Sequence, residues 1–204
     1  MFFIHYFAVM LVSCLFRLCE SGEQVFAGFK AKRDDLSASD IGIIQFDTRP
    51  LTDYWEASAR WNKAYAQYHG HKYVYMSMQT ECKCGEYLVS PVWCKVKAMV
   101  HASDILPRAK AFVFLDSDAV VTSNHSLADI VAYMRHDLQW DLRTRPVAFN
   151  QDGPGWSCKH TMELGFNYCF NSGTVFWLNN DAGRNIVREW WNSCADPYES
   201  SVFP

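Results

Sequence analysis

The pattern of apolar and polar residues predicts a series of short strands. Residues 41–46 are an apolar run of the kind found in a buried strand, and residues 72–78 alternate as strand residues do. Three further short apolar runs lie at 111–115, 146–149 and 174–178. These five segments are the predicted strands of the chain.

The segments between the strands carry helical periodicity. Helices are predicted at 52–70, 90–107, 126–135 and 181–193. The first ends at a glycine, and the second begins with a serine N-cap followed by a proline in its first turn. Strands that alternate with helices of this length indicate an α/β sandwich with a mainly parallel sheet.

The first predicted helix carries a stripe of aromatic residues. Tyr54, Trp61, Tyr65 and Tyr68 follow one another at steps of seven, four and three, so they share one helical face. We predict that this stripe packs in the core. A platform for sugar rings is the alternative.

The N-terminal segment differs from the rest of the chain. Residues 1–16 are almost wholly apolar and, as a helix, would span about 24 Å, which is short of a hydrocarbon core of about 30 Å. We predict a secretory signal peptide cleaved after Ser21; a signal anchor and a buried core helix are the alternatives. Polar residues 22–39 are predicted to be a stem or linker, and 40–204 a single domain.

Composition excludes some functional classes. The chain has 204 residues, of which 50% are hydrophobic, enough for a packed core. Its formal net charge is -3, and it has no basic excess that would predict binding to nucleic acid. Contact with a membrane is expected only through the N-terminal segment, if that segment is not removed.

The cysteines fit an exported protein. Six of the eight lie after the predicted leader, and an even number in an exported chain suggests disulfides, with 15 ways of pairing six cysteines. Cys82 and Cys84 are too close together to form a zinc knuckle. Asn124 begins a glycosylation sequon. The expected location is the secretory pathway, in the lumen of the Golgi or the endoplasmic reticulum.

The clearest chemical signal is the string Phe112-Val-Phe-Leu-Asp-Ser-Asp118. A buried strand here leads directly into two carboxylates, Asp116 and Asp118. Ligands of open α/β sheets bind at the carboxyl ends of the strands, which also draws attention to Asp47 and to residues 150–152. Hard divalent ions such as Mn²⁺ or Mg²⁺ prefer oxygen ligands and often share them with phosphates. The string therefore predicts a metal-assisted reaction of a phosphate-containing substrate, and a simple capping turn is the alternative.

The order of several motifs resembles one enzyme family. The chain is similar to the galactosyl-, xylosyl- and mannosyltransferases of plants and fungi, which are retaining enzymes with a Rossmann-like GT-A fold. The resemblance runs from about residue 41 to the end. Its motifs are Ile43-Ile-Gln-Phe46, Asn62-Lys-Ala-Tyr-Ala-Gln-Tyr-His-Gly70, Trp93-Cys-Lys95, Phe114-Leu-Asp-Ser-Asp118, Asn171-Ser-Gly-Thr-Val-Phe-Trp177 and Trp190-Trp191.

The resemblance implies roles at the metal and the donor. Asp118 matches the principal metal ligand, and Asp116 matches a residue that contacts both the metal and the donor ribose. Lys95 would lie near the diphosphate of a UDP- or GDP-sugar; a solvated helix lysine is the alternative. The implied cofactor is Mn²⁺ or Mg²⁺, and the implied partners are a nucleotide-sugar donor and a glycan or glycoprotein acceptor.

The resemblance also implies catalytic residues. Asn171, Ser172 and Gly173 match a loop along which the backbone approaches the donor sugar, and glycine allows that approach. Gln151 or Asp152 would position the sugar or stabilise an oxocarbenium-like transition state. For this pair, a turn rich in glycine and proline is the alternative.

Two other functions remain open from the sequence. Asp116-Ser-Asp-Ala-Val120 also fits the nucleophile motif of haloacid-dehalogenase-type phosphatases, although that fold usually begins with this strand. The resemblance further implies a metal-binding His near the C-terminus, yet no His follows His160. The expectation is therefore a metal-assisted glycosyltransferase, whole or C-terminally truncated, and the alternative is a non-catalytic exported domain that binds a glycan or a partner.

Overall fold

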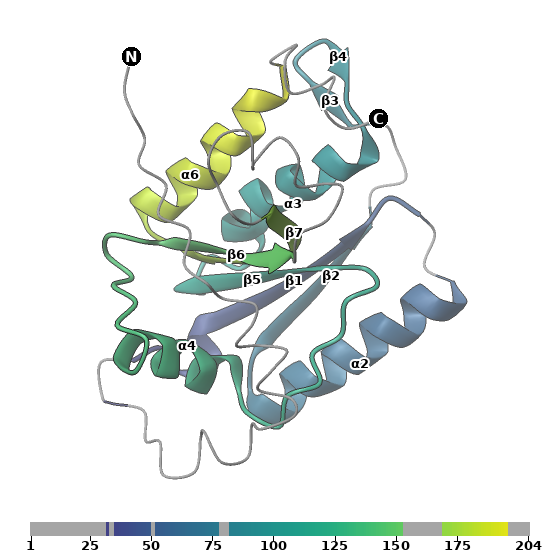
Figure 1. The fold of residues 1–204 in the computed structure, drawn as a ribbon. Coiled ribbons are helices and arrows are strands. Elements are labelled where there is room, and N and C mark those ends of the chain that lie inside the picture. Colours follow the sequence, from purple (N-terminus) through teal and green to yellow (C-terminus); the bar gives the residue numbers. More distant parts are fainter. Residues whose placement is uncertain (1–31, 33–34, 50–51, 78–81, 153–168, 196–204) are drawn as a thin grey trace.

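A five-stranded sheet with the strand order β2-β1-β5-β7-β6 lies at the centre of the molecule (Figure 1). The computed structural model describes residues 32, 35–49, 52–77, 82–152 and 169–195. The sheet strands are β1 (Ile41–Asp47), β2 (Lys72–Ser77), β5 (Ala111–Asp116), β6 (Val147–Asp152) and β7 (Cys169–Leu178). The other elements are η1 (Ala38–Asp40), α2 (Asp53–His69), β3 (Lys83–Cys84), β4 (Tyr87–Leu88), α3 (Pro91–Ile105), α4 (Leu127–His136), α6 (Asp181–Asn192) and η3 (Ser193–Ala195).

The direction of the strands confirms the predicted sheet. β1 is parallel to β2 and to β5, whereas β7 is antiparallel to both of its neighbours, β5 and β6. Four of the five strands therefore run the same way, and β7 alone runs the other way. Every residue of β1 is buried, as expected for a central strand covered on both faces.

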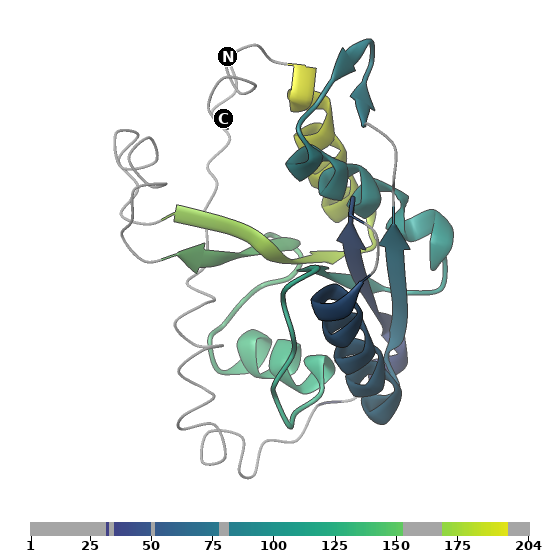
Figure 2. The same ribbon diagram turned by 90° about the vertical axis from the view of Figure 1, so that its right-hand side faces the viewer.

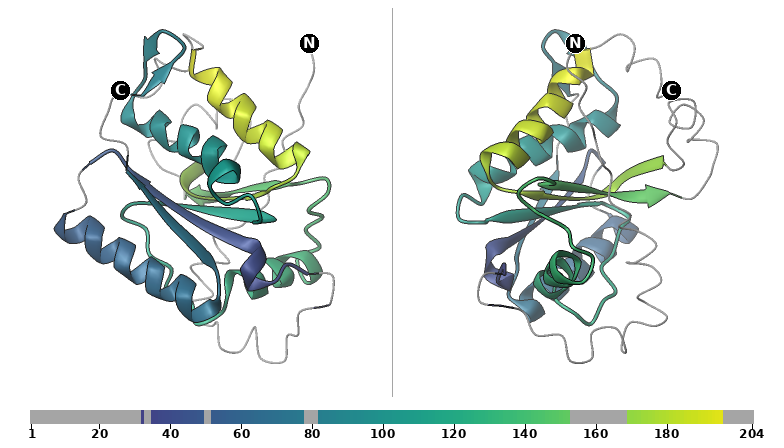
Figure 3. Two further views of the ribbon diagram at one scale, coloured as in Figure 1. Left: turned by 180° about the vertical axis from the view of Figure 1, so that it is seen from behind. Right: turned by 60° about the vertical axis from the view of Figure 1, so that its left-hand side comes forward.

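Helices cover both faces of the sheet (Figures 2 and 3). One apolar cluster joins α2 and α4 to alternate residues of β1 and β5, such as Ile43 and Val113. The other joins α3 and α6 to the intervening residues, such as Ile44 and Phe114. Side chains alternate between the two faces of a strand, which explains why neighbouring residues belong to different clusters.

The prediction that the aromatic stripe of α2 packs in the core is wrong for three of its four residues. Tyr65 is buried, with 8% of its surface exposed, but Tyr54, Trp61 and Tyr68 are 59%, 56% and 84% exposed. The sheet-facing side of α2 instead consists largely of small and polar residues, which bring the helix close to the strands. The buried residues of α2 are Ser58, Ala59, Asn62, Tyr65 and Ala66.

Two disulfides connect the hairpin β3–β4 to the helices beside it. Cys82 pairs with Cys94 in α3, and Cys84 pairs with Cys194 in η3, with Cα atoms 5.6 and 6.3 Å apart. The prediction of disulfides is therefore confirmed for four cysteines. Cys158 lies outside the described residues, and the side chain of Cys169 is not described.

His71 connects the N-terminus of α4 to the chain before β1. Its Nδ1 lies 2.8 Å from the carbonyl oxygen of Ala38, and its Nε2 accepts a hydrogen bond of 3.1 Å from the backbone N–H of Leu127. A ring that donates at Nδ1 and accepts at Nε2 is neutral. Burial lowers the pKa of His71 below its ordinary value of 6.5, which favours the same neutral form.

We expect acidification to destabilise the protein partly through His71. Because the folded-state pKa of His71 is lowered, the unfolded chain binds more protons below pH 6.5, so stability falls as the pH drops below that value. In His71→Gln, the free energy of unfolding should fall by about 1–3 kcal/mol at pH 7.5, because the buried backbone N–H of Leu127 loses its acceptor. It should also change less between pH 7.5 and 5.5 than in the wild type.

Urea unfolding at several pH values measures both effects. His69 also has a pKa lowered by burial, so some pH dependence remains in the variant. The exposed His101 provides the control for the loss of a histidine side chain, through the variant His101→Gln. An unchanged pH dependence in His71→Gln would contradict the prediction.

The predicted leader lies outside the described residues. Residues 1–31 are not described, so the choice between a signal peptide, a signal anchor and a core helix stays a prediction. Among the helices that the structure describes, none combines the length and the apolar character needed to span a bilayer.

Candidate active site

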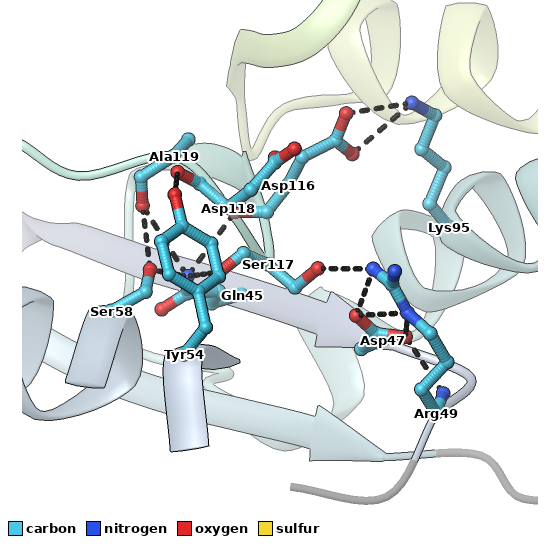
Figure 4. A network of polar contacts seen from close by, with 10 residues as sticks. All are labelled: Gln45, Asp47, Arg49, Tyr54, Ser58, Lys95, Asp116, Ser117, Asp118 and Ala119. Carbon is cyan, nitrogen blue, oxygen red and sulfur yellow. Dashed lines mark hydrogen bonds and ion pairs between the residues drawn. The ribbon is translucent and has the colours of Figure 1, made fainter. Parts of the chain in front are cut away.

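β1 and β5 end at the same edge of the sheet, and three aspartates lie at or just after these ends. Asp116 is the last residue of β5 and pairs in register with Phe46, so Asp47 at the end of β1 lies beside it. A turn follows directly and contains Ser117, which is buried, and Asp118, which is exposed. Figure 4 shows the carboxyl groups of Asp116 and Asp118 close together, above the end of β1.

Lys95 of α3 reaches the same carboxylate. Its Nζ lies 3.1 and 3.2 Å from the two carboxylate oxygens of Asp116, and its side chain is only 12% exposed. The solvated-lysine alternative is therefore wrong: a cation of α3 faces the first carboxylate of the motif. Burial raises the pKa of Asp116; Lys95 opposes this effect, and the nearby charge of Asp118 adds to it.

A buried glutamine anchors the turn that carries these carboxylates. Gln45 of β1 has no exposed surface, and its Nε2 donates to the backbone carbonyls of Asp116 and Ser117, each at 3.1 Å. Its Oε1 accepts hydrogen bonds from Asn62 of α2 and Tyr73 of β2. The turn is thus held by Gln45 of β1, which is itself bonded to α2 and β2.

Asn62 extends this anchor along the chain after the turn. Its Nδ2 donates to the carbonyl of Ala119 at 2.8 Å, and its Oδ1 accepts from the backbone N–H of Val121 at 2.9 Å. In the sequence, Gln45 and Asn62 stand out only as parts of motifs. A polar residue inside an apolar strand was the available signal that Gln45 has a buried partner.

Arg49 is a further charged residue at the site, and the sequence analysis did not identify it. Its guanidinium donates to both carboxylate oxygens of Asp47, at 2.7–3.1 Å, and to the hydroxyl of Ser117 at 3.1 Å. It also lies 3.6 Å from the ring centroid of Trp55, a cation–π contact. Arg49 therefore links β1, α2 and the turn between the two carboxylates (Figure 4).

We expect Arg49→Met to make the protein more sensitive to acid. Burial alone raises the pKa of Asp47, but the bonds from Arg49 outweigh it and hold that pKa below its ordinary value. A lowered pKa contributes stability above the pKa of the unfolded state, and this contribution is lost as the pH falls through the folded-state pKa. Without Arg49, less of this stability is present at neutral pH.

The measurement is the urea midpoint as a function of pH. Arg49→Met should have a lower midpoint at pH 7 and should unfold at a higher pH than the wild type on acidification. Arg143 is the matched control, because it pairs with Asp141 on the surface and is 89% exposed. Equal behaviour of the two variants would contradict a structural role for the Arg49–Asp47 pair.

The segment that the resemblance placed in a loop is part of a strand. Asn171, Ser172 and Gly173 lie in β7, so the prediction of a loop is wrong. Asn171 accepts a hydrogen bond from the backbone N–H of Gly173 through its Oδ1, at 2.6 Å. A side-chain carbon at Gly173 would lie 3.1 Å from a carboxylate oxygen of Asp116, so this glycine lets β7 pass close to the carboxylate.

Gln151 and Asp152 are the last two residues of β6, so they are not part of a turn. They pair with Phe170 and Cys169 of β7, after an irregularity in register between Phe149 and Asn150. β7 pairs with β5 only from Thr174 onward. The backbone of Gln151 and Asp152 therefore lies beyond the carboxyl end of β5, on the side of the carboxylates, while their side chains are not described.

The carboxylates suit a hard divalent cation. In the parts of the chain that the structure describes, no three or more His, Cys, Asp or Glu residues form a group able to hold a metal. The carboxylate oxygens of Asp116 and Asp118 nevertheless lie close together, and Mg²⁺-like ions are commonly held by one or two carboxylates together with substrate phosphates and water. Lys95 adds a positive charge that would face the same anions.

The fold is that of a glycosyltransferase. The chain is similar to the crystal structure of a glycosyltransferase involved in the glycosylation of the major capsid of PBCV-1, with a TM-score of 0.53 and 17% sequence identity over 80% of this chain and 71% of that one. Residues 43–201 match the model of the GMA12/MNN10 galactosyl transferase family. The protein belongs to this family and is an enzyme that transfers sugar. Comparison with curated proteins gives no match.

Membership in this family confirms the GT-A-like resemblance and decides against the phosphatase. The topology agrees, because β1, α2 and β2 precede the aspartates, and both of these strands belong to the same sheet as β5. A phosphatase of that class usually starts with the strand that carries the aspartates.

Proposed function

We propose that the enzyme transfers a sugar from a UDP- or GDP-sugar to a glycan acceptor with the help of Mn²⁺ or Mg²⁺. The observation that carries the proposal is the meeting of Asp116, Asp118 and Lys95 at the carboxyl edge of the sheet, where α/β folds bind their ligands. The carboxylates provide negative charge for a metal ion, and Lys95 provides positive charge for a diphosphate.

The residues divide between the metal and the diphosphate. Asp116 and Asp118 would hold the metal, which when bound supplies Lewis-acid stabilisation of the departing nucleoside diphosphate. Lys95 pairs with Asp116, and its charge would face a diphosphate oxygen when the carboxylate holds a cation. Arg49 and Gln45 hold the turn in place throughout.

The donor sugar would lie over the start of β7. Gly173 has no side chain between the backbone of β7 and Asp116, so the sugar would approach the backbone there, and Ser172 is its neighbour in the strand. Asn171, Gln151 and Asp152 are the proposed catalytic residues, because β6 and β7 extend past β5 at this edge. One of them would position the sugar or stabilise positive charge at its anomeric carbon.

The proposed place of action is the lumen of the Golgi or endoplasmic reticulum. The apolar N-terminal segment supports this proposal, and so do the two disulfides, because disulfides persist in oxidising compartments. Asn124 of the sequon is exposed, as a glycosylated asparagine must be.

Calorimetric titration tests the donor site. The protein beginning at Gly22 is titrated with UDP and with GDP, each with and without Mn²⁺. We expect one nucleotide to bind, and to bind more tightly with the metal, which identifies the donor class. A folded sample that binds neither nucleotide would refute the proposal.

A further inference from the structure

The exposed face of α2 has an ordered arrangement. Tyr54, Ala57, Trp61, Ala64 and Tyr68 follow one another at alternating steps of three and four, and all five are exposed. We call these five residues the aromatic face. Each heptad advances a helix by about 10.5 Å, so the three rings form a row of about 21 Å with an alanine between each pair. Exposed aromatics in a continuous row indicate a binding surface.

The first two rings are held in place without being buried. The indole Nε1 of Trp61 donates to the carbonyl of Val121 at 2.7 Å, and the hydroxyl of Tyr54 donates to the carbonyl of Asp118 at 3.3 Å. Both rings still expose more than half of their surface. A ring fixed at its polar edge is pre-organised to bind an apolar surface against its face, because little side-chain entropy remains to be lost.

The row begins at the candidate active site. Tyr54 contacts the backbone of Asp118, the second carboxylate of the motif, and Trp61 contacts the same chain three residues further on. A molecule lying along the aromatic face would therefore have one end beside the metal-binding turn (Figure 4). The acceptor is the substrate that has to extend outward from this point.

The chemistry of the aromatic face favours a glycan over a partner helix. Steps of three and four also occur in coiled coils, but those seams use branched aliphatic residues that interlock with the partner. Here flat rings alternate with alanines, which leaves shallow spaces between the rings. Sugar rings present apolar C–H faces to aromatic rings and hydroxyl groups to polar neighbours, of which Arg60 and Lys63 are exposed on the same helix.

We propose that the aromatic face binds an extended acceptor glycan, with Tyr54 nearest the reacting end and Tyr68 farthest from it. This inference rests on the proposed function only in assigning the glycan as the acceptor. Because the row is long, it makes a prediction about chain length: a hexasaccharide reaches Tyr68, whereas a disaccharide placed at Tyr54 does not.

The test measures binding of oligosaccharides to the full chain. Cellohexaose, mannohexaose and the corresponding disaccharides are titrated while the tryptophan fluorescence is followed. We expect one hexasaccharide to bind more tightly than its disaccharide. Tyr68→Ala should weaken binding of the hexasaccharide about tenfold and leave the disaccharide unchanged, while Trp61→Ala should weaken both.

Two further variants separate stacking from other effects. Trp61→Phe keeps a ring and loses the bond to Val121, so it should bind better than Trp61→Ala. Ile105→Ala, which removes an exposed apolar side chain from the end of α3, should bind as the wild type does. Tyr68 is 84% exposed, so Tyr68→Ala gives a folded sample even if Trp61→Ala does not.

The outcomes distinguish this inference from the proposed donor site. If neither hexasaccharide binds, or if Tyr68→Ala binds both lengths as the wild type does, the inference is wrong even when UDP or GDP binds. If no nucleotide binds but the length dependence is found, the donor proposal fails and the glycan surface stands. A dimer in sedimentation that Tyr68→Ala dissociates would show a protein partner instead and overturn the inference.

Discussion

The Asp118→Asn variant is expected to lose its metal-dependent nucleotide binding and to transfer sugar about a thousandfold more slowly than the wild type. Metal stabilisation of a leaving diphosphate is worth several kcal/mol, and about 4 kcal/mol corresponds to a thousandfold in rate. The substitution keeps the size of the side chain and removes the charge that a divalent cation requires. Since Asp118 is exposed, the fold should be preserved.

The two readouts are calorimetry with and without Mn²⁺ and release of nucleoside diphosphate from the donor. Asp104→Asn provides the control, because Asp104 is 81% exposed on α3 and lies outside the site. It should bind and react as the wild type does. If Asp118→Asn retains metal-dependent binding of full strength, Asp118 is not a metal ligand and the proposed site is wrong.

The Gln45→Leu variant is expected to have the largest effect on stability, with the free energy of unfolding lowered by about 3 kcal/mol. Leucine fills a similar volume, so the loss comes from polar groups left without a partner. These are the carbonyl of Ser117 and the hydroxyl of Tyr73, whereas the carbonyl of Asp116 still accepts from the backbone N–H of Ala119. All lie around a side chain with no exposed surface.

Urea denaturation measures this loss, with Gln67→Leu as the control, because Gln67 is on the exposed side of α2. The control should change the free energy of unfolding by less than about 0.5 kcal/mol. Gln45→Leu should also bind the metal–nucleotide pair more weakly under conditions in which it is folded, because the turn loses its anchor. A variant as stable as the control would show that the network of Gln45 contributes little.

The local pattern of the sequence was enough to place most elements. The predicted strand at 41–46 and the helices ending at Gly70 and beginning after Ser90 are found within a residue or two. The apolar run before Asp116 also predicted correctly that the carboxylates lie at the carboxyl end of a strand. These features depend on neighbouring residues, which is why periodicity, caps and breakers reveal them.

The local pattern could not reveal which residues contact Asp116 and the turn that follows it. Lys95, Arg49 and Gly173 meet Asp116 or its turn from α3, the end of β1 and β7, and only the order of the strands brings them together. A lysine in a helix has the same local sequence signal whether it faces water or a carboxylate. The early boundary of β7 was missed for the same reason, because pairing with β6 extends the strand through polar residues.

The sequence by itself determined the alternation of strands and helices, the position of the two aspartates and the motifs of the family. The tertiary structure decided which side of α2 faces the sheet, which cysteines pair and which charges share an edge. The stripe of α2 shows why. Periodicity places Tyr54, Trp61 and Tyr65 on one side of a helix, but the contacts made by distant residues decide which of them is covered, and here only Tyr65 is buried.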